Sequence, residues 1–237
     1  MHESDSSLAN VSILEEQLED SKNTICIQGI KQVLSGLYKI HPTAGPVFFV
    51  RDWYFGIENF EKLLEDFETV FFEDREKGEK TSFCLTEEQC LLLLDASEAY
   101  LAERYAMGLL NRSEQSRFLL FQKLLKKKFR ISYINAVLDF LEYEGHLSDL
   151  RFSEAWLRQR MRSKKESRTK LYQELLLRSI SSQTAKQALD TAFEDVDEEE
   201  ILRDLIDSYI SKGFDRDKII KKCMYYGFPL KVINTLL

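Results

Sequence analysis

The C-terminal half of the chain repeats itself. Residues 116–138 align without gaps on residues 167–189 at an offset of 51, and a further offset of 48 aligns residues 215–237. Apolar residues match throughout the alignment and predict a shared set of core positions: Leu120/Leu171/Ile219, Leu124/Leu175/Cys223, Leu125/Leu176/Met224, Phe129/Ile180/Phe228 and Leu138/Leu189/Leu237. A repeat of this length is typical of small helical units that stack on their neighbours to bury their apolar faces.

Polar residues follow the same register as the apolar ones. Ser116, Ser167 and Asp215 occupy equivalent positions, and each can cap the start of a helix through its side-chain oxygen. Pro229 falls at the start of the last helix, where a missing N–H costs little. We therefore expect a mainly α fold, with three tandem three-helix repeats forming an elongated curved solenoid and a small N-terminal β-containing part.

The N-terminal part has a different pattern from the repeats. Short aromatic and β-branched runs predict strands, and Val47–Phe55 has the pattern of a hairpin that turns at Arg51-Asp52. Glu73–Ser82 is expected to be an exposed loop. A capping box, Thr86 to Gln89, then predicts the start of a long helix.

These patterns predict four domains. They are an acidic N-terminal part with short strands and a loop (1–85), a long helix with the first repeat (86–146), the second repeat (147–196) and the third repeat (197–237).

The composition argues against an enzyme or a membrane protein. The start of the chain lacks the basic and apolar regions of a signal peptide, and no run reaches the roughly 18 apolar residues of a membrane span, so we expect a cytoplasmic protein. The four cysteines lie at no metal-ligand spacing and are expected to be buried thiols, and the three histidines are isolated. Phosphate-binding glycine loops and hydrolase motifs are absent. We therefore expect no catalytic residues, no metal and no cofactor.

Charge is distributed unevenly along the chain. The net charge is −12 over residues 1–98, +8 over residues 99–181 and −3 over residues 182–237. A basic middle between acidic ends predicts a polyanionic or acidic partner there, although a solvated basic face would give the same pattern.

The basic residues of the second repeat form a stripe. On a helix that begins near Asp149, Arg151, Arg158, Arg162 and Lys165 fall within an arc of about 60°, apart from the apolar positions. Trp156 lies on neither face and is expected to pack between repeats, with base stacking as the alternative. The candidate partner-binding residues are Arg112, Lys126, Lys127, Lys128, Arg151, Arg158, Arg162, Lys165, Arg168 and Lys170.

The second repeat also resembles a known family. Gly145–Arg160, which reads GHLSDLRFSEAWLRQR, is similar to the signature of the RecX family, and Arg168–Ile180 is similar to that family's basic second helix. Leu109–Ser113 stands at the place of a further family motif. The chain departs from the pattern at several positions: Ser148 for Asp, Ser153 for Ala, Lys128 and Ser179 for glycines, and Glu166-Ser167 for a Gly-Pro-like pair.

The resemblance implies a regulator of recombination and of the SOS response. Such a protein would lie in the groove of the filament that RecA forms on single-stranded DNA. There it would lower ATP hydrolysis, strand exchange and the filament-stimulated cleavage of the LexA repressor. We expect a monomer with no membrane partner and weak direct contact with DNA at most.

Two other interpretations stay open. A helical-repeat DNA-binding protein would use the same cationic stripe for phosphates, and its affinity for free DNA would fall steeply with added salt. A helical-repeat adaptor for another protein would show neither the salt-dependent DNA binding nor an effect on RecA.

Overall fold

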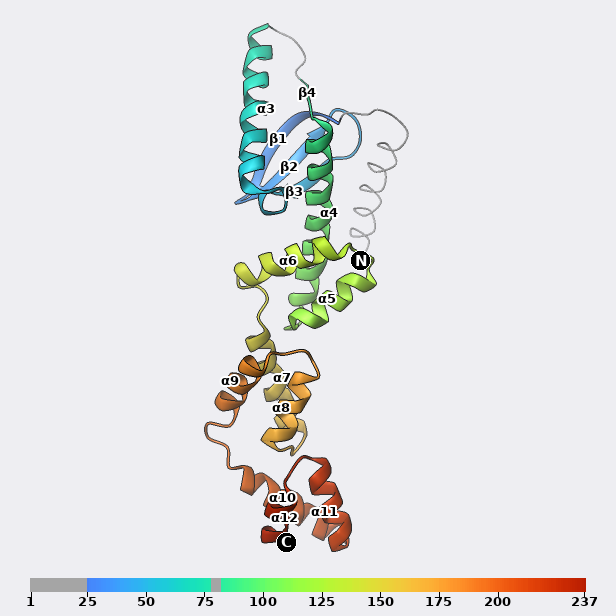
Figure 1. Ribbon diagram of the computed structural model, residues 1–237, viewed down its shortest axis with the longest axis vertical. Coiled ribbons are helices and arrows are strands. Elements are labelled where there is room, and N and C mark those ends of the chain that lie inside the picture. The colour runs from blue at the N-terminus through green and yellow to red at the C-terminus, as the bar shows by residue number, and fades with distance from the viewer. Residues whose placement is uncertain (1–24, 78–81) are drawn as a thin grey trace. The chain divides into compact units, whose positions relative to one another are not determined.

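A computed structural model of the chain describes residues 25–77 and 82–237. Within them, a small antiparallel sheet precedes a succession of helices that continues to the C-terminus (Figure 1). The prediction of a mainly α fold with a small N-terminal sheet is confirmed. The described residues form two compact units, one of those from 25 to Leu109 with Phe121–His146, the other of Leu110–Leu120 with Leu147–Leu237. The four-domain division stays a prediction.

The sheet has the strand order β3-β2-β1-β4, and all neighbouring strands are antiparallel. Its strands are β1 (Cys26–Leu34), β2 (Leu37–Pro42), β3 (Phe48–Arg51) and β4 (Phe83–Cys84). A two-residue turn joins β1 to β2. Its second residue, Gly36, has a φ of 66°, a conformation that glycine adopts without a steric penalty.

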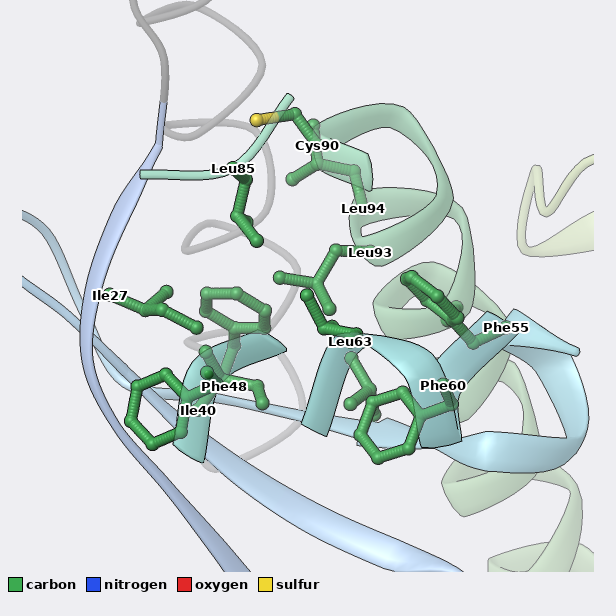
Figure 2. Packing of buried hydrophobic residues seen from close by; sticks show 13 residues of the cluster. Ile27, Ile40, Phe48, Phe55, Phe60, Leu63, Leu85, Cys90, Leu93 and Leu94 are labelled. Carbon is green, nitrogen blue, oxygen red and sulfur yellow. The ribbon is translucent and has the colours of Figure 1, made fainter. Parts of the chain in front are cut away.

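Two helices bury the apolar face of this sheet. From α3 (Ile57–Lys77), Phe60 and Leu63 pack into the core, and Leu93 does so from α4 (Glu87–Leu110) (Figure 2). All three side chains are buried. The N-terminal part therefore has an apolar core of its own.

The predicted hairpin across Val47–Phe55 is wrong in its second half, where the chain forms the one-turn helix α2 (Asp52–Phe55). A helical turn sends successive side chains in different directions. Phe55 therefore enters the sheet core, while Trp53 packs on Phe140 with 5.6 Å between ring centroids. Strand alternation would have put Trp53 and Phe55 on the same face.

The cysteines differ in part from the expectation of buried thiols. Cys26 and Cys84 form a disulfide that joins β1 to β4. The expectation is wrong for these two, because strand pairing brings together residues that are 58 positions apart. Cys90 and Cys223 are free and buried, as predicted.

The segment between α3 and α4 is predicted to be a loop followed by a capping box. The predicted loop at Glu73–Ser82 starts too early, because α3 continues to Lys77, and residues 78–81 lie outside the described part. The last residues of α3 are rich in Glu and Lys, which favour the helical conformation. The capping box is confirmed, with reciprocal hydrogen bonds of 2.9 and 3.2 Å between Thr86 and Gln89.

Nine helices follow β4, all of them within the described residues: α4, α5 (Arg117–Lys126), α6 (Ile131–Tyr143), α7 (Asp149–Ser163), α8 (Arg168–Leu176), α9 (Ser182–Ala192), α10 (Glu198–Ser211), α11 (Arg216–Tyr225) and α12 (Leu230–Leu236). The second helix of each repeat has an N-cap at the equivalent position. Ser116, Ser167 and Asp215 each accept a hydrogen bond from the backbone amide three residues further on, at 3.2, 3.1 and 2.8 Å. The predicted caps at the second helix of each repeat are confirmed.

The second helices also end alike. Lys128, Ser179 and Gly227 follow α5, α8 and α11 with φ values of 68°, 60° and 91°. In each case the next amide donates to the carbonyl five residues earlier, at 3.4, 3.2 and 3.2 Å. This is a Schellman turn, which favours glycine at the left-handed position.

One set of predicted core positions is wrong. The positions of Leu120 and Leu124 are buried in all three repeats, but Leu125, Leu176 and Met224 are 44%, 39% and 50% exposed. They lie one residue, or about 100°, beyond the buried position, on the last turn of a helix. Apolar character alone could not show that the chain leaves them in solvent.

The same contact joins each repeat to the next. The backbone amide of Arg117 donates to Asp149 at 2.7 Å, and that of Arg168 donates to Glu198 at 2.9 Å. In both cases a carboxylate at the start of one repeat's first helix satisfies an amide at the start of the preceding repeat's second helix. Such amides have no partner within their own helix.

Candidate partner-binding surface

Helix α7 carries most of the predicted basic stripe. Ser148 caps it by accepting a hydrogen bond from the Arg151 amide at 3.3 Å. An acidic residue lies in the first turn and two arginines in the last turn, which complements the helix dipole. Phe152 and Leu157 are buried on the inner face.

Arg158 and Arg162 lie on the outer face of α7. Both side chains are exposed, and neither forms an ion pair or hydrogen bond with the residues that the structure describes. They are one helical turn apart, where like charges repel modestly. An anion placed between them would relieve that repulsion, so this pair is suited to an external acidic group.

Four other predicted residues of this unit are already paired. The ion pairs are Arg151 with Glu114 at 3.0 Å, Lys165 with Asp204 at 2.7 Å, Arg168 with Asp190, and Lys170 with Glu174 at 3.5 Å. Surface pairs of this kind stabilise a protein by about 1 kcal/mol or less, so a partner can displace them. Lys165 lies beyond the end of α7, so the helical arc predicted for it does not apply.

The remaining predicted residues are exposed. Arg112 lies in the turn after α4. Lys126 ends α5, and Lys127 and Lys128 follow it in the Schellman turn. The three lysines belong to the first compact unit, and Lys127 Nζ lies 5.3 Å from the centroid of the Tyr105 ring.

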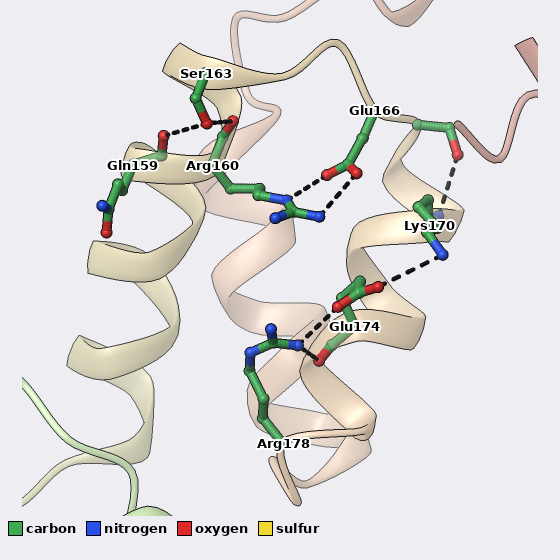
Figure 3. Close-up of polar contacts among 8 residues, drawn as sticks. Gln159, Arg160, Ser163, Glu166, Lys170, Glu174 and Arg178 are labelled. Atoms are coloured by element: carbon green, nitrogen blue, oxygen red, sulfur yellow. Dashed lines mark hydrogen bonds and ion pairs between the residues drawn. The ribbon is translucent and has the colours of Figure 1, made fainter. Parts of the chain in front are cut away.

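A buried ion pair holds the segment between α7 and α8. Arg160 donates from Nε and Nη2 to Glu166 at 2.6 and 2.9 Å (Figure 3). Glu166 is only 3% exposed, and its hydrogen bond is the main cause of the raised pKa of Arg160. Removing one partner of such a pair leaves an uncompensated buried charge. Arg160 is therefore structural, although it belongs to the same basic run as its neighbours.

Trp156 packs beside this pair, within the second repeat, and its packing between repeats stays a prediction. It is half-buried, and the guanidinium groups of Arg160 and Arg178 lie 5.6 and 4.6 Å from its ring. Arg178 also donates to Glu174 at 2.8 Å, and this hydrogen bond is the main cause of the lowered pKa of Glu174 (Figure 3). Only the contact between Trp156 and Arg178 joins residues far apart in the sequence, and the spacing of the residues did not indicate it.

Within residues 25–77 and 82–237, no group of three or more His, Cys, Asp or Glu side chains is placed to hold a metal ion. In the same ranges, none of the helices combines the length and the apolar character that a membrane crossing requires.

Sequence comparison connects the α7–α9 region to known proteins. Residues 148–189 match the family model described as RecX, second three-helix domain. The chain is 38% identical over 129 residues to the Regulatory protein RecX of Treponema pallidum (strain Nichols), covering 54% of this chain and 79% of that protein. It is 24% identical over 172 residues to the Regulatory protein RecX of Caldanaerobacter subterraneus subsp. tengcongensis, covering 73% and 85%.

Solved structures show the same fold. The crystal structure of a regulatory protein RecX superposes with a TM-score of 0.63 at 16% identity, covering 90% of this chain and 98% of the other. RecX from Lactobacillus salivarius gives a TM-score of 0.50 at 18% identity, covering 60% and 95%.

Proposed function

This chain belongs to the RecX family of regulatory proteins, and from that premise we propose that it binds RecA filaments on single-stranded DNA and lowers their activity. The affected activities are ATP hydrolysis, strand exchange and the stimulated cleavage of LexA. The protein acts by binding and carries out no chemistry of its own.

The observation that carries the proposal is the free arginine pair on α7. Arg158 and Arg162 lie inside the segment that matches the family model, and both are exposed and unpaired among the described residues. The buried pair of Arg160 with Glu166 fixes the C-terminal end of the same helix. The cationic face is therefore held on a rigid element, which limits the entropy lost when it meets an acidic partner.

Four further cations of this unit are only weakly paired. Arg151, Lys165, Arg168 and Lys170 can each exchange an internal carboxylate for one on a partner at small cost. Several such contacts along a filament add avidity without requiring a deep pocket. The binding strength should accordingly fall as the salt concentration rises.

The test is a double charge reversal. Arg158→Glu with Arg162→Glu should leave the fold unchanged, since exposed substitutions usually alter stability by less than about 0.5 kcal/mol. The affinity for RecA filaments assembled on oligo(dT) should fall at least about tenfold, because reversal turns attraction into repulsion. Cosedimentation measures the affinity, and circular dichroism checks the fold.

The matched control keeps the net charge of the variant. Lys186→Glu with Lys231→Glu changes two exposed lysines in the same unit by the same total charge. If both double variants bind as well as the parent, the α7 stripe is not the interface. If free oligo(dT) binds the parent as tightly as the filament does, direct DNA binding replaces the proposed function.

A further inference from the structure

The repeats share an exposed apolar site that folding alone does not explain. Leu125, Leu176 and Met224 stand at equivalent positions, and each is more than a third exposed. At the next position, Leu177 and Tyr225 are 77% and 71% exposed. Single exposed apolar side chains are common, but here the same feature recurs at the same place in every repeat.

The Schellman turns fix this site in space. The carbonyls of Leu125, Leu176 and Met224 accept hydrogen bonds from the left-handed residues that follow, each at 2.9 Å. The preceding residues, Leu124, Leu175 and Cys223, are buried. Their packing fixes the orientation of the helix end about its axis. Each exposed side chain is therefore presented by a rigid helix terminus and not by a loop.

Cations accompany the apolar residues. Helix α5 carries three basic residues and no acid, and α11 carries four basic residues and one acid. Lys221 and Lys222 lie within about one turn of Tyr225, and their side chains form no ion pair or hydrogen bond within the described part of the chain. In the second compact unit, Lys170 of α8 also reaches to 5.9 Å from the Tyr225 ring centroid.

The chemistry of these sites favours a protein partner over bases. Leucines occupy the site in two of the three repeats, and aliphatic side chains offer no stacking face to a nucleobase. An apolar centre with a cationic border complements an acidic surface that has an exposed apolar side chain. Equivalent sites in successive repeats fit a partner that presents such a surface repeatedly.

We propose that the C-terminal ends of α5, α8 and α11 are three equivalent docking points, each for one acidic, apolar patch on a subunit of a polymeric protein. This inference rests on the proposed function, which supplies the RecA filament as the polymer. It adds a second surface to the α7 stripe, with one docking point for each repeat. Each docking point contributes separately, so losses of affinity multiply when two are removed.

The experiment uses Leu177→Ser, Tyr225→Ser and their combination in the full chain. Each single change should weaken binding to RecA filaments about fivefold, and the pair should weaken it by the product of the two factors. The control is Ile210→Ser, since Ile210 is 56% exposed in the same unit but lies on α10. This control should bind as the parent does.

The outcomes separate this inference from the proposed function. If the parent binds filaments and the double variant binds equally well, the docking points are refuted and the proposed function stands. If the parent itself fails to bind, both are overturned. A parallel loss of affinity for free oligo(dT) would show that the sites contact DNA, which contradicts a protein partner. Unchanged melting temperatures would exclude unfolding as the cause of any loss.

Discussion

At the scale of single residues, the three Schellman turns show where side-chain identity and backbone conformation conflict. Lys128 and Ser179 adopt a left-handed conformation that glycine adopts at Gly227. Non-glycine residues pay a steric cost there, because Cβ comes close to the following carbonyl oxygen. The sequence indicated these positions, since the family pattern has glycine at both.

Replacing Ser179 by glycine should therefore stabilise the protein. We expect the free energy of unfolding to rise by about 0.5–1 kcal/mol, because relief of strain outweighs the added entropy of the unfolded chain. Gly227→Ala should do the opposite, since a Cβ there would come within 2.4 Å of Ser167 Oγ and 2.6 Å of Lys170 Cβ. Urea denaturation measures both changes, and a loss of stability in Ser179→Gly would contradict the assignment of strain.

At the scale of elements, the helices were predictable and the connections less so. The helices of the repeats followed from a register in which polar caps and apolar residues agree, and Ser116, Ser167 and Asp215 all cap as expected. The strand predicted at Trp53–Phe55 failed because aromatic residues suit a buried turn of helix as well as a strand. The disulfide depends on strand pairing between residues 58 positions apart, which the sequence spacing does not encode, and the pair of Arg160 with Glu166 depends on how the chain turns after α7.

The disulfide should stabilise the N-terminal sheet measurably. The short strand β4 pairs with β1 through two residues, and the bond between Cys26 and Cys84 closes a loop with a sequence separation of 58. Reduction, or Cys84→Ser, should lower the free energy of unfolding by roughly 2–4 kcal/mol, because the unfolded chain regains loop entropy. Thermal melting with and without dithiothreitol tests this. Equal melting temperatures would show that the bond contributes nothing.

The contacts between repeats give a second prediction at this scale. Glu198→Ala removes the acceptor for the Arg168 amide and should cost about 1–2 kcal/mol, as the loss of a helix cap does. Hydrogen exchange should show faster exchange of that amide. Glu199→Ala is the control, since the Glu199 side chain pairs with the exposed Arg203 one turn away on the same helix. Equal exchange in both variants would refute the role of Glu198.

At the scale of the whole molecule, the basic segment of the chain lies within the repeats. The basic middle of the chain (99–181) overlaps the part that matches the RecX family model (148–189), while the N-terminal part is strongly acidic. The cations of α7 and the exposed apolar residues of the second helices lie on helices of the repeats. The sequence predicted the cationic stripe. The repeat pattern also predicted that the exposed apolar residues belong to the core, because periodicity cannot show where a neighbouring helix is missing.

Binding to RecA filaments is the function that we propose for this protein. The most direct measurement is the steady-state rate of DNA-dependent ATP hydrolysis by preassembled RecA filaments, titrated with the parent protein. We expect the rate to fall saturably with added protein, and the Arg158→Glu, Arg162→Glu variant to require a much higher concentration. An unchanged rate at concentrations well above that of RecA would contradict the account.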